Sequence, residues 1–370
     1  MSINSRTLSY SFYLSDLKSG LPVNIRISND RIIRTYVDFI PETCTVDLIT
    51  NCDPKQPLIP YPDHYHPAVM IDIYLAQISA IESLYECQIP DYARYVRILL
   101  LELHRILNHF DFFISLGYNI QFQRLFKNAH EDSQCIRSLI HSIEIVHPLN
   151  TFFSIGGIST DIPTGFIENL EFISAKIDKK LIYYKKQLLK NVVLVNLLID
   201  IGIITEKNAE DYALSGPNLK ASLDRITRQN TITNPFYKDI ENHPVEIDYR
   251  KGSTGDSWSR CWIRYLEIEN SIRVIRQVMD ILMKTEIILS EPPIISKREV
   301  THDFRFEGTE GIIRSNIVKS AQDFCLTGKH QLPLLHVIKH LGSITENCRL
   351  QSLSTILASL NLNSAKYFLS

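Results

Sequence analysis

The chain has 370 residues, of which 45% are hydrophobic and 22% charged, as expected of a soluble globular protein with one large or two ordinary domains. Its formal net charge of −2 does not provide the concentrated positive charge that a nucleic-acid partner requires. The 13 glycines form neither a G-x-G-x-x-G nor a G-x-x-x-x-G-K-[ST] segment, which argues against the common phosphate-binding loops for dinucleotides and ATP.

The first forty residues are predicted to form strands. Apolar residues alternate with polar ones over 7–14, 23–28 and 33–39, and Asn29-Asp30 supplies a turn. This pattern predicts an antiparallel hairpin with one buried face. Residues 51–67 contain five prolines and are therefore predicted to be a loop.

From residue 69 onward the hydrophobic period becomes helical. Thr205 and Asp256 suit the first positions of two of these helices, because their side-chain oxygens can accept hydrogen bonds from free backbone N–H groups. The predicted helices span 69–85, about 90–110, 123–145, 165–190, 206–212 and 256–284. Short strands are predicted over 300–330, followed by closing helices at 332–341 and 350–360.

The order of these elements predicts an α+β fold that is mainly α. A small N-terminal antiparallel sheet leads into a large helical bundle, and a short α/β tail packs on it. The predicted division of the chain is 1–67, 68–290 and 291–370.

The seven cysteines are scattered, and no two form a C-x-x-C pair. This spacing argues against a disulfide framework, and equally against an iron–sulfur cluster or a nickel site, because both need clustered thiolates. We therefore expect free thiols in a reducing compartment and no metal bound by this chain.

No apolar run approaches the roughly twenty residues of a membrane span. The N-terminal segment also lacks the cationic and apolar regions of a signal peptide. Any membrane contact is therefore expected to come through partner proteins.

The proline-rich loop ends in Asp63-His64-Tyr65-His66. Two imidazoles, a phenol and a carboxylate within four residues could bind a metal ion or deliver protons to a reduced substrate. Loops fixed by proline also carry surface histidines, so a functional site and an ordinary surface loop both fit this segment.

Charged residues recur along the second predicted helix at Arg97, Glu102, Arg105 and His109. Arg97 and Arg105 are eight residues apart and lie on nearly one face, and Glu102 can reach Arg105 across one turn. The pattern favours ion pairs between packed helices.

Gly156 and Gly157, followed by Asp161 two residues before a proline, predict a tight elbow at the entry to the next helix. Glycine at these positions permits close backbone approach or a positive φ. The segment from Ser215 to Ser222 also joins two elements, and its polar groups are predicted to cap helices.

Gly255 and Asp256 precede the last long helix, on which Arg260, Arg264 and Glu267 share one polar face. This face predicts an internal salt-bridge network. None of the candidate segments contains a nucleophile–base pair or a pair of catalytic carboxylates, so the residues alone assign no reaction.

In order and spacing, these segments resemble the forty-nine-kilodalton, hydrogenase-large-subunit-like subunit of respiratory complex I, NADH:ubiquinone oxidoreductase. The resemblance covers roughly residues 12–315 and is strongest over 90–280. It is carried by the residues from Arg97 to His109, the Gly156 elbow and the Gly255 helix start. The family is related to nickel–iron hydrogenase large subunits and lacks their metal-binding cysteine pairs, which implies a similar helical fold without a metal.

The resemblance also implies a function. Such a subunit lies in the peripheral arm of a proton-translocating complex, on the matrix side of the mitochondrial inner membrane or the cytoplasmic side of a bacterial membrane. It binds no cofactor itself. With the neighbouring subunit that carries the terminal iron–sulfur cluster, and near a membrane-arm subunit at the quinone entrance, it forms the cavity for the substrate ubiquinone.

The family places a His from a His-Pro-x-x-His-Gly motif and a Tyr beside the quinone. Alignment of Ser19 and Gly20 with the His-Gly turn puts Ser15 at the first His, and the Asp that pairs with this His falls on Asn119. A small local shift brings Tyr65 to the position of the family's Tyr. The implied polar lining of the quinone cavity is Tyr65, His64, His66, Ser15 and Asn119.

Two hypotheses follow for this divergent chain. In the first, it is a genuine complex I subunit that shapes the quinone cavity without the family's Asp–His couple. In the second, it is a catalytically silent relative with a structural or assembly role in the same complex. Its catalytic residues stay unassigned under both.

Overall fold

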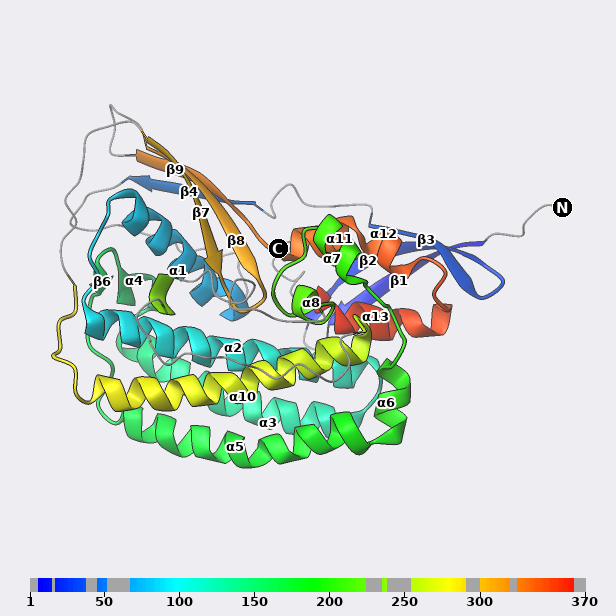
Figure 1. Ribbon diagram of the computed structural model, residues 1–370, viewed down its shortest axis with the longest axis horizontal. Helices are drawn as coiled ribbons and strands as arrows, with labels where there is room; N and C mark the ends of the chain where they lie inside the picture. Colours follow the sequence, from blue (N-terminus) through cyan, green and yellow to red (C-terminus); the bar gives the residue numbers. More distant parts are fainter. Residues whose placement is uncertain are drawn as a thin grey trace.

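The structure is a computed structural model that describes residues 6–14, 17–37, 45–51, 67–223, 235–237, 254–290, 300–319 and 325–362. Long helices form the lower layer in Figure 1, and two antiparallel sheets lie above them. The predicted class, α+β and mainly α, is confirmed.

Long helices form the lower layer, and α2 is central to it because α1, α3, α10 and α13 all contact it (Figure 1). With 29 residues, α2 is about 43 Å long. Most of its residues are buried, since neighbouring elements cover it on several sides. The long helices are α1 (Pro67–Leu84), α2 (Asp91–Asn119), α3 (Gln123–Val146), α5 (Phe166–Lys190) and α10 (Ser257–Leu282).

The predicted helices and their caps agree well with the structure. The Thr205 hydroxyl accepts a hydrogen bond from the backbone N–H of Asn208 at 3.2 Å. The Asp256 carboxylate accepts one from the N–H of Ser259 at 2.7 Å. Both predicted caps are therefore confirmed.

Short helices connect and close the bundle. The predicted helix 332–341 is two helices, α11 and α12, divided at His340, and the predicted helix 350–360 begins with a 3₁₀ turn, η2. The short helices are α4 (Leu149–Phe152), α6 (Val192–Leu198), α7 (Glu206–Asp211), α8 (Gly216–Lys220), η1 (Pro235–Tyr237), α11 (Leu334–Lys339), α12 (Leu341–Thr345), η2 (Leu350–Ser352) and α13 (Leu353–Ser359).

The first sheet has the order β1-β2-β3, with antiparallel pairing throughout. Its strands are β1 (Arg6–Leu14), β2 (Leu17–Ser28) and β3 (Arg31–Val37). The hairpin predicted from the alternating pattern is therefore part of a three-stranded sheet. Val23, Ile25 and Ile32 are buried, which confirms one buried face in the part of this sheet whose side chains are described.

The second sheet has the order β4-β9-β8-β7 and was only partly predicted. The strands β7 (Val300–Glu307), β8 (Ile312–Lys319) and β9 (Cys325–Gln331) confirm the prediction for 300–330. The strand β4 (Thr45–Asn51) was not predicted, and it pairs with β9 from Thr45 opposite Gln331 to Asn51 opposite Cys325. Alternation alone does not reveal a partner so distant in sequence.

Segments from the N-terminal and C-terminal parts of the chain thus pair with each other. Besides the β4–β9 pairing, Arg31 at the start of β3 forms an antiparallel bridge with Arg349. The division at residues 67 and 290 stays a prediction. Asn51 ends β4, and residues 52–66 of the predicted loop lie outside the described residues.

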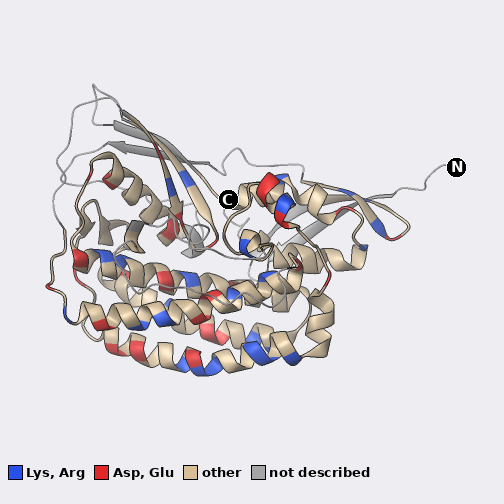
Figure 2. Ribbon diagram, viewed as in Figure 1, with Lys and Arg blue, Asp and Glu red and all other residues tan. Residues whose placement is uncertain are grey.

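A very short hairpin, β5 (Phe153–Ser154) with β6 (Gly157–Ile158), lies between α4 and α5. Among the helices that the structure describes, none is both long enough and apolar enough to cross a bilayer. Positively and negatively charged residues are spread along α5, which lies at the edge of the bundle (Figure 2).

Candidate functional site

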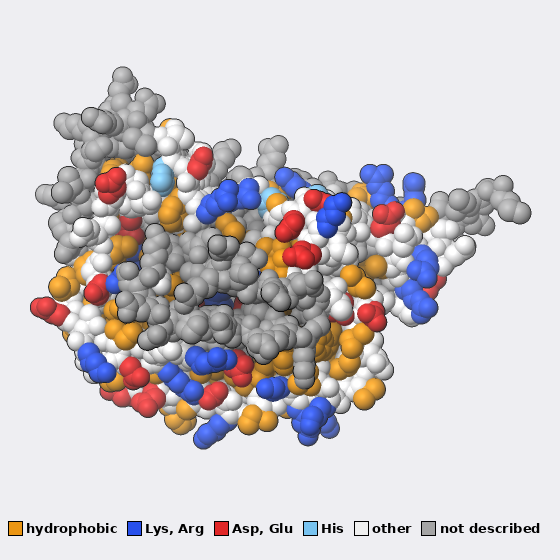
Figure 3. All heavy atoms as spheres, in the orientation of Figure 1, with side chains coloured by type: hydrophobic (Ala, Val, Ile, Leu, Met, Phe, Trp, Pro, Cys, Tyr) orange, Lys and Arg blue, Asp and Glu red, His pale blue; other side chains and the backbone are white. Residues whose placement is uncertain are grey.

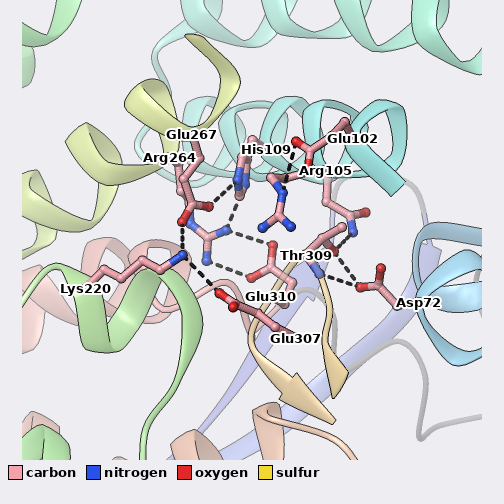
Figure 4. Close-up of polar contacts among 11 residues, drawn as sticks. Asp72, Glu102, Arg105, His109, Lys220, Arg264, Glu267, Glu307, Thr309 and Glu310 are labelled. Atoms are coloured by element: carbon pink, nitrogen blue, oxygen red, sulfur yellow. Dashed lines mark hydrogen bonds and ion pairs between the residues drawn. The ribbon is translucent and has the colours of Figure 1, made fainter. Parts of the chain in front are cut away.

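The most polar part of the described interior surrounds the tip of the β7–β8 hairpin. Residues 308–311 connect the two strands, and the tip reaches α1, α2, α8 and α10 (Figure 4). Glycines make this approach possible, because a Cβ on Gly308 would lie 2.8 Å from the Asp72 carboxylate. We call the charged residues around this tip the buried network: Asp72, Glu102, His104, Arg105, His109, Lys220, Arg264, Glu267, Glu307 and Glu310.

Asp72 on α1 holds the tip from one side. Its Oδ2 accepts hydrogen bonds from the backbone N–H of Thr309 at 2.8 Å and from the Thr309 hydroxyl at 2.7 Å. Its Oδ1 lies 3.1 Å from Nδ1 of His104 on α2. Burial favours the neutral acid, but His104 and Thr309 outweigh it and lower the pKa of Asp72.

His104 and Asn108 complete this side of the site. The Asn108 amide donates to the Thr309 hydroxyl. His104 is fully buried, and its Nε2 has no hydrogen-bond partner among the described residues. The contact with Asp72 therefore fixes the ring orientation.

Lys220 at the end of α8 bridges two carboxylates from different elements. Its Nζ lies 2.8 Å from Glu267 on α10 and 3.3 Å from Glu307 on β7. Burial alone would lower the pKa of Lys220, but the two carboxylates raise it. For Glu267, the nearby Lys220 and His109 outweigh burial and hold the carboxyl pKa well below its usual range.

His109 connects α2 to the same carboxylate. Its Nε2 lies 2.7 Å from Glu267, and its Nδ1 lies 3.2 Å from an Arg264 nitrogen. An arginine can only donate, so Nδ1 accepts and Nε2–H donates to Glu267, which assigns the neutral tautomer. Burial lowers the pKa of His109, in agreement with this assignment.

Arg264 holds the opposite end of the tip. Its two terminal nitrogens lie 2.7 and 2.8 Å from the two oxygens of Glu310, a bidentate pair. The guanidinium also lies 4.4 Å from the centre of the Phe112 ring. Because Arg264 is fully buried, these contacts replace its lost hydration.

Along α2, the predicted contact between Glu102 and Arg105 is confirmed at 3.4 Å. The Tyr237 hydroxyl also donates to Glu102. Burial, together with the negative charge of Glu102, raises the pKa of Tyr237 well above its usual value. The phenol therefore stays protonated and serves as a donor.

Arg97 forms a separate buried pair. Its terminal nitrogens donate to the two oxygens of Glu82 on α1 at 2.8 and 2.7 Å. They also donate to the carbonyls of Ser154 at 2.8 Å and Gly157 at 2.7 Å. This pair between α1 and α2 confirms the predicted ion pairing for Arg97, whereas the neutral His109 donates a hydrogen bond to Glu267 on α10.

The predicted elbow at Gly156 and Gly157 is confirmed. Both residues have positive φ, and a Cβ on Gly157 would lie 2.0 Å from the Leu289 carbonyl oxygen. Asp161 accepts a hydrogen bond from the Tyr92 hydroxyl at 2.5 Å, which ties the elbow to the start of α2.

Replacement of Gly157 with alanine is expected to lower the free energy of unfolding by about 2–5 kcal/mol, because the methyl group adds a backbone clash to an unfavourable φ. Gly165→Ala is the matched control, since Gly165 has a φ of +82° but no atom within 4 Å of the added Cβ. Its expected loss is about 1–2 kcal/mol. Urea unfolding measures both, and equal losses would contradict the close approach at Gly157.

At the start of α10, one expectation was wrong. Arg260 does not join a salt-bridge network: it donates to the carbonyls of Gly202 at 3.0 Å and Gly255 at 2.8 Å, and to the Ser359 hydroxyl at 2.8 Å. Burial lowers the pKa of Arg260 to about 10. The Arg260 guanidinium is therefore satisfied by backbone carbonyls and a hydroxyl, which take the place of the carboxylate expected in a salt bridge.

The segment from Ser215 to Ser222 also differs from its prediction. The Ser215 hydroxyl accepts from the backbone N–H of Ile312 at 3.0 Å rather than capping α8. Lys220 was expected to belong to a capping segment and instead bridges Glu267 and Glu307. The Glu-Gly-Thr-Glu-Gly turn between two alternating strands was the available signal for the tip.

Of the residues predicted to line a quinone cavity, the structure describes Asn119, which is separate from the buried network. Asn119 lies at the end of α2, about 15 Å along the helix from His109. Its side-chain amide donates to the backbone carbonyl of Ser115 at 2.8 Å, and its backbone carbonyl accepts a hydrogen bond from the Ser354 hydroxyl. Ser15, His64, Tyr65 and His66 lie outside the described residues.

Most charged groups of the buried network face oppositely charged or hydrogen-bonding partners. Over the described ranges, no group of three or more His, Cys, Asp or Glu side chains is arranged to hold a metal ion. The geometry therefore supports a mechanical role, in which ion pairs fix a hairpin between helices. Fold and site together define a mainly helical protein with a fixed, charged interior.

Comparison with known proteins finds similarity to one family of subunits. The family described as the 49 kDa subunit of respiratory-chain NADH dehydrogenase matches residues 146–327, just under half of the chain. This stretch contains the Gly156 elbow, Lys220, Glu267 and the hairpin tip. The chain is therefore a divergent relative of that subunit, and the resemblance seen in the sequence is confirmed.

Individual relatives have modest identity to the chain. A Clostridium beijerinckii protein, named as the D-type subunit of NADH-quinone oxidoreductase, is 26% identical over 292 residues, 78% of this chain and 72% of the relative. A Bacillus cereus protein of the same name is 26% identical over 308 residues, 82% of each chain. A Rickettsia felis protein of that name is 30% identical over 217 residues, 58% of this chain and 54% of the relative.

Proposed function

We propose that the chain is a peripheral-arm subunit of a proton-translocating NADH:quinone oxidoreductase and helps to form its ubiquinone cavity. The similarity to proteins named as the D-type subunit of NADH-quinone oxidoreductase carries this proposal. Under it, the partners include a neighbouring subunit with the terminal iron–sulfur cluster and a membrane-arm subunit at the quinone entrance. The helical bundle then shares its origin with nickel–iron hydrogenase large subunits.

The arrangement of α1 supports a role for Tyr65. This residue precedes the first residue of α1, Pro67, by two positions. Asp72 on α1 contacts His104, and Glu82 further along α1 contacts Arg97, so α1 and α2 run antiparallel. The start of α1, which follows Tyr65 in the sequence, therefore lies toward the end of α2 that bears Asn119.

In this proposal the chain's own side chains bind and orient the quinone. The Tyr65 hydroxyl donates a hydrogen bond to a quinone carbonyl, where negative charge develops during reduction. His64, His66, Ser15 and Asn119 supply further polar groups. The buried network contributes by fixing α1, whose first residue follows this loop in the sequence.

Replacement of Tyr65 with phenylalanine is expected to lower NADH:quinone turnover in the purified assembly roughly tenfold or more, because it removes one hydrogen-bond donor and keeps the ring. Tyr61→Phe is the matched control in the same loop and is expected to keep the wild-type rate. Rotenone-sensitive quinone reduction measures both. An unchanged rate for Tyr65→Phe would remove the assignment of this residue to the cavity.

A second function is a structural or assembly role without catalysis. The observation that favours it is that Ser15 and Asn119 stand where the family has a His and an Asp. A silent subunit would join the assembly and keep its buried ion pairs, yet Tyr65→Phe would not change turnover. A second gene in the same genome with an intact His-Pro-x-x-His-Gly motif would favour this alternative.

A further inference from the structure

A polar cleft opens where the start of β3, the end of α6 and the η2–α13 segment meet. Its volume is about 660 Å³, within the range of about 300–1,000 Å³ that is usual for small-ligand sites. Arg31, residues 196–202 and residues 347–355 contribute to its walls. No member of the buried network lines it, so it is a separate feature of the molecule.

Two arginines stand opposite each other in the wall of this cleft. Arg31 and Arg349 form an antiparallel bridge, and the flanking backbone hydrogen bonds, at 2.9 and 3.1 Å, make it a non-hydrogen-bonded pair. In such pairs the Cα atoms are only about 4.5 Å apart and the side chains are closest. Like charges directly opposite destabilise a sheet, and an anion held between the two arginines would relieve this repulsion.

The described surroundings only partly balance these two positive charges. Arg31 donates to the Asn347 carbonyl at 2.6 Å, and no ion pair or hydrogen bond links the Arg349 side chain to the rest of the described chain. Asp200 is the one carboxylate among the described residues that line the cleft. Burial raises the pKa of the Cys348 thiol, which therefore stays neutral. One positive charge is left in excess.

We propose that this cleft binds a phosphate group between the Arg31 and Arg349 guanidiniums. Arginine pairs with phosphate through two parallel hydrogen bonds, and the cross-strand geometry brings two such forks to one place. The inference stands independently of the proposed function.

An apolar wall beside the arginines favours a phosphate ester over a bare ion. Leu197 and Ile199 line the cleft and are 38% and 42% exposed. Val192 and Val193 at the start of α6 are also exposed, and Figure 3 shows apolar side chains over this helix. A soluble phosphate ester and a phospholipid headgroup share this chemistry.

Replacement of Arg349 with glutamate is expected to weaken pyrophosphate binding to the full-length chain about tenfold or more, because the new carboxylate takes the place of the anion. Since Arg31 then faces an opposite charge, the ligand-free melting temperature should not fall. Isothermal titration calorimetry at low ionic strength and a thermal melt measure the two quantities. Wild-type affinity in this variant would overturn the proposal.

Arg34→Glu is the matched control. Arg34 stands opposite Arg26 in the β2–β3 register, so the same charge change relieves a similar pair outside the cleft, and binding should persist. Co-sedimentation with phosphatidylglycerol–phosphatidylcholine vesicles, against phosphatidylcholine alone, separates a lipid headgroup from a soluble phosphate. Binding of neither pyrophosphate nor anionic vesicles by the wild-type chain would also overturn the proposal.

Discussion

Replacement of Lys220 with methionine is expected to lower the free energy of unfolding by about 3–5 kcal/mol. The Lys220 ammonium is the cation shared by Glu267 and Glu307, and all three residues are buried. Methionine has a similar volume, so the expected loss comes from two buried carboxylates that lose their common partner. Urea unfolding of the full chain at pH 7 measures the change.

The loss of stability in Lys220→Met is also expected to depend on pH. In the wild type, the pKa of Glu267 is lowered on folding, so its stabilisation is complete above the unfolded value of about 4.3 and is lost as the pH falls below it. Without Lys220, less positive charge offsets burial, so this pKa should rise, and acid should then neutralise the carboxylate that has lost its cation. The difference in stability between variant and wild type should therefore narrow from pH 7 to pH 4.

Arg276→Gln is the control for Lys220→Met. Arg276 lies on α10 like Glu267, but its pair with Asp178 is 45% and 44% exposed, and the expected change is below about 1 kcal/mol. The double variant Lys220→Met/Glu267→Gln should lose less than the sum of the single variants, because it removes one charge of each sign. A loss for Lys220→Met no larger than that of Arg276→Gln would contradict the role of the bridge.

Replacement of Arg97 with methionine is also expected to lower the free energy of unfolding by about 3–5 kcal/mol. Arg97 is fully buried, and its loss removes a donor from the carbonyls of Ser154 and Gly157. The Glu82 carboxylate keeps the Gly156 N–H as a donor but loses its positively charged partner. Because these groups connect α1, α2 and the elbow, hydrogen exchange should also increase at residues 153–158. Urea unfolding and hydrogen-exchange mass spectrometry measure the two effects.

Arg273→Met provides the matched control for Arg97→Met. Arg273 forms an i,i+4 pair with Glu269, and its side chain is 58% exposed, so we expect a change within about 0.5 kcal/mol. Glu82→Leu combined with Arg97→Met removes both buried charges and should restore part of the stability. If the double variant is as unstable as the sum of its parts, the stabilisation does not come from this ion pair.

The helices and their caps could be predicted from the sequence because their signals are local. The leucine-rich period of α2 and the N-cap residues Thr205 and Asp256 lie within the elements that they define. The pairing of β4 with β9 could not be predicted, since nothing near residue 45 indicates a partner near residue 331. The strand was missed for the same reason.

The ion pairs of the site also divide into local contacts, which could be predicted, and contacts between distant segments, which could not. The Glu102–Arg105 contact spans one helical turn and was predicted, whereas Lys220, Glu267 and Glu307 come from three separate elements. Arg260 and Glu267 lie on the same helix, but the sequence did not reveal their partners. Arg260 binds neutral oxygens, whereas Glu267 binds the Lys220 ammonium and the neutral His109. The partner of each buried charged side chain depends on which groups the tertiary structure places next to it.

The most direct test of the proposed assignment is purification of the native assembly through an affinity tag on this chain, followed by identification of its subunits. We predict recovery of an iron–sulfur subunit in contact with the Gly156 elbow, together with rotenone-sensitive NADH:quinone activity. Recovery of the chain alone, with neither an iron–sulfur partner nor that activity, would contradict the assignment.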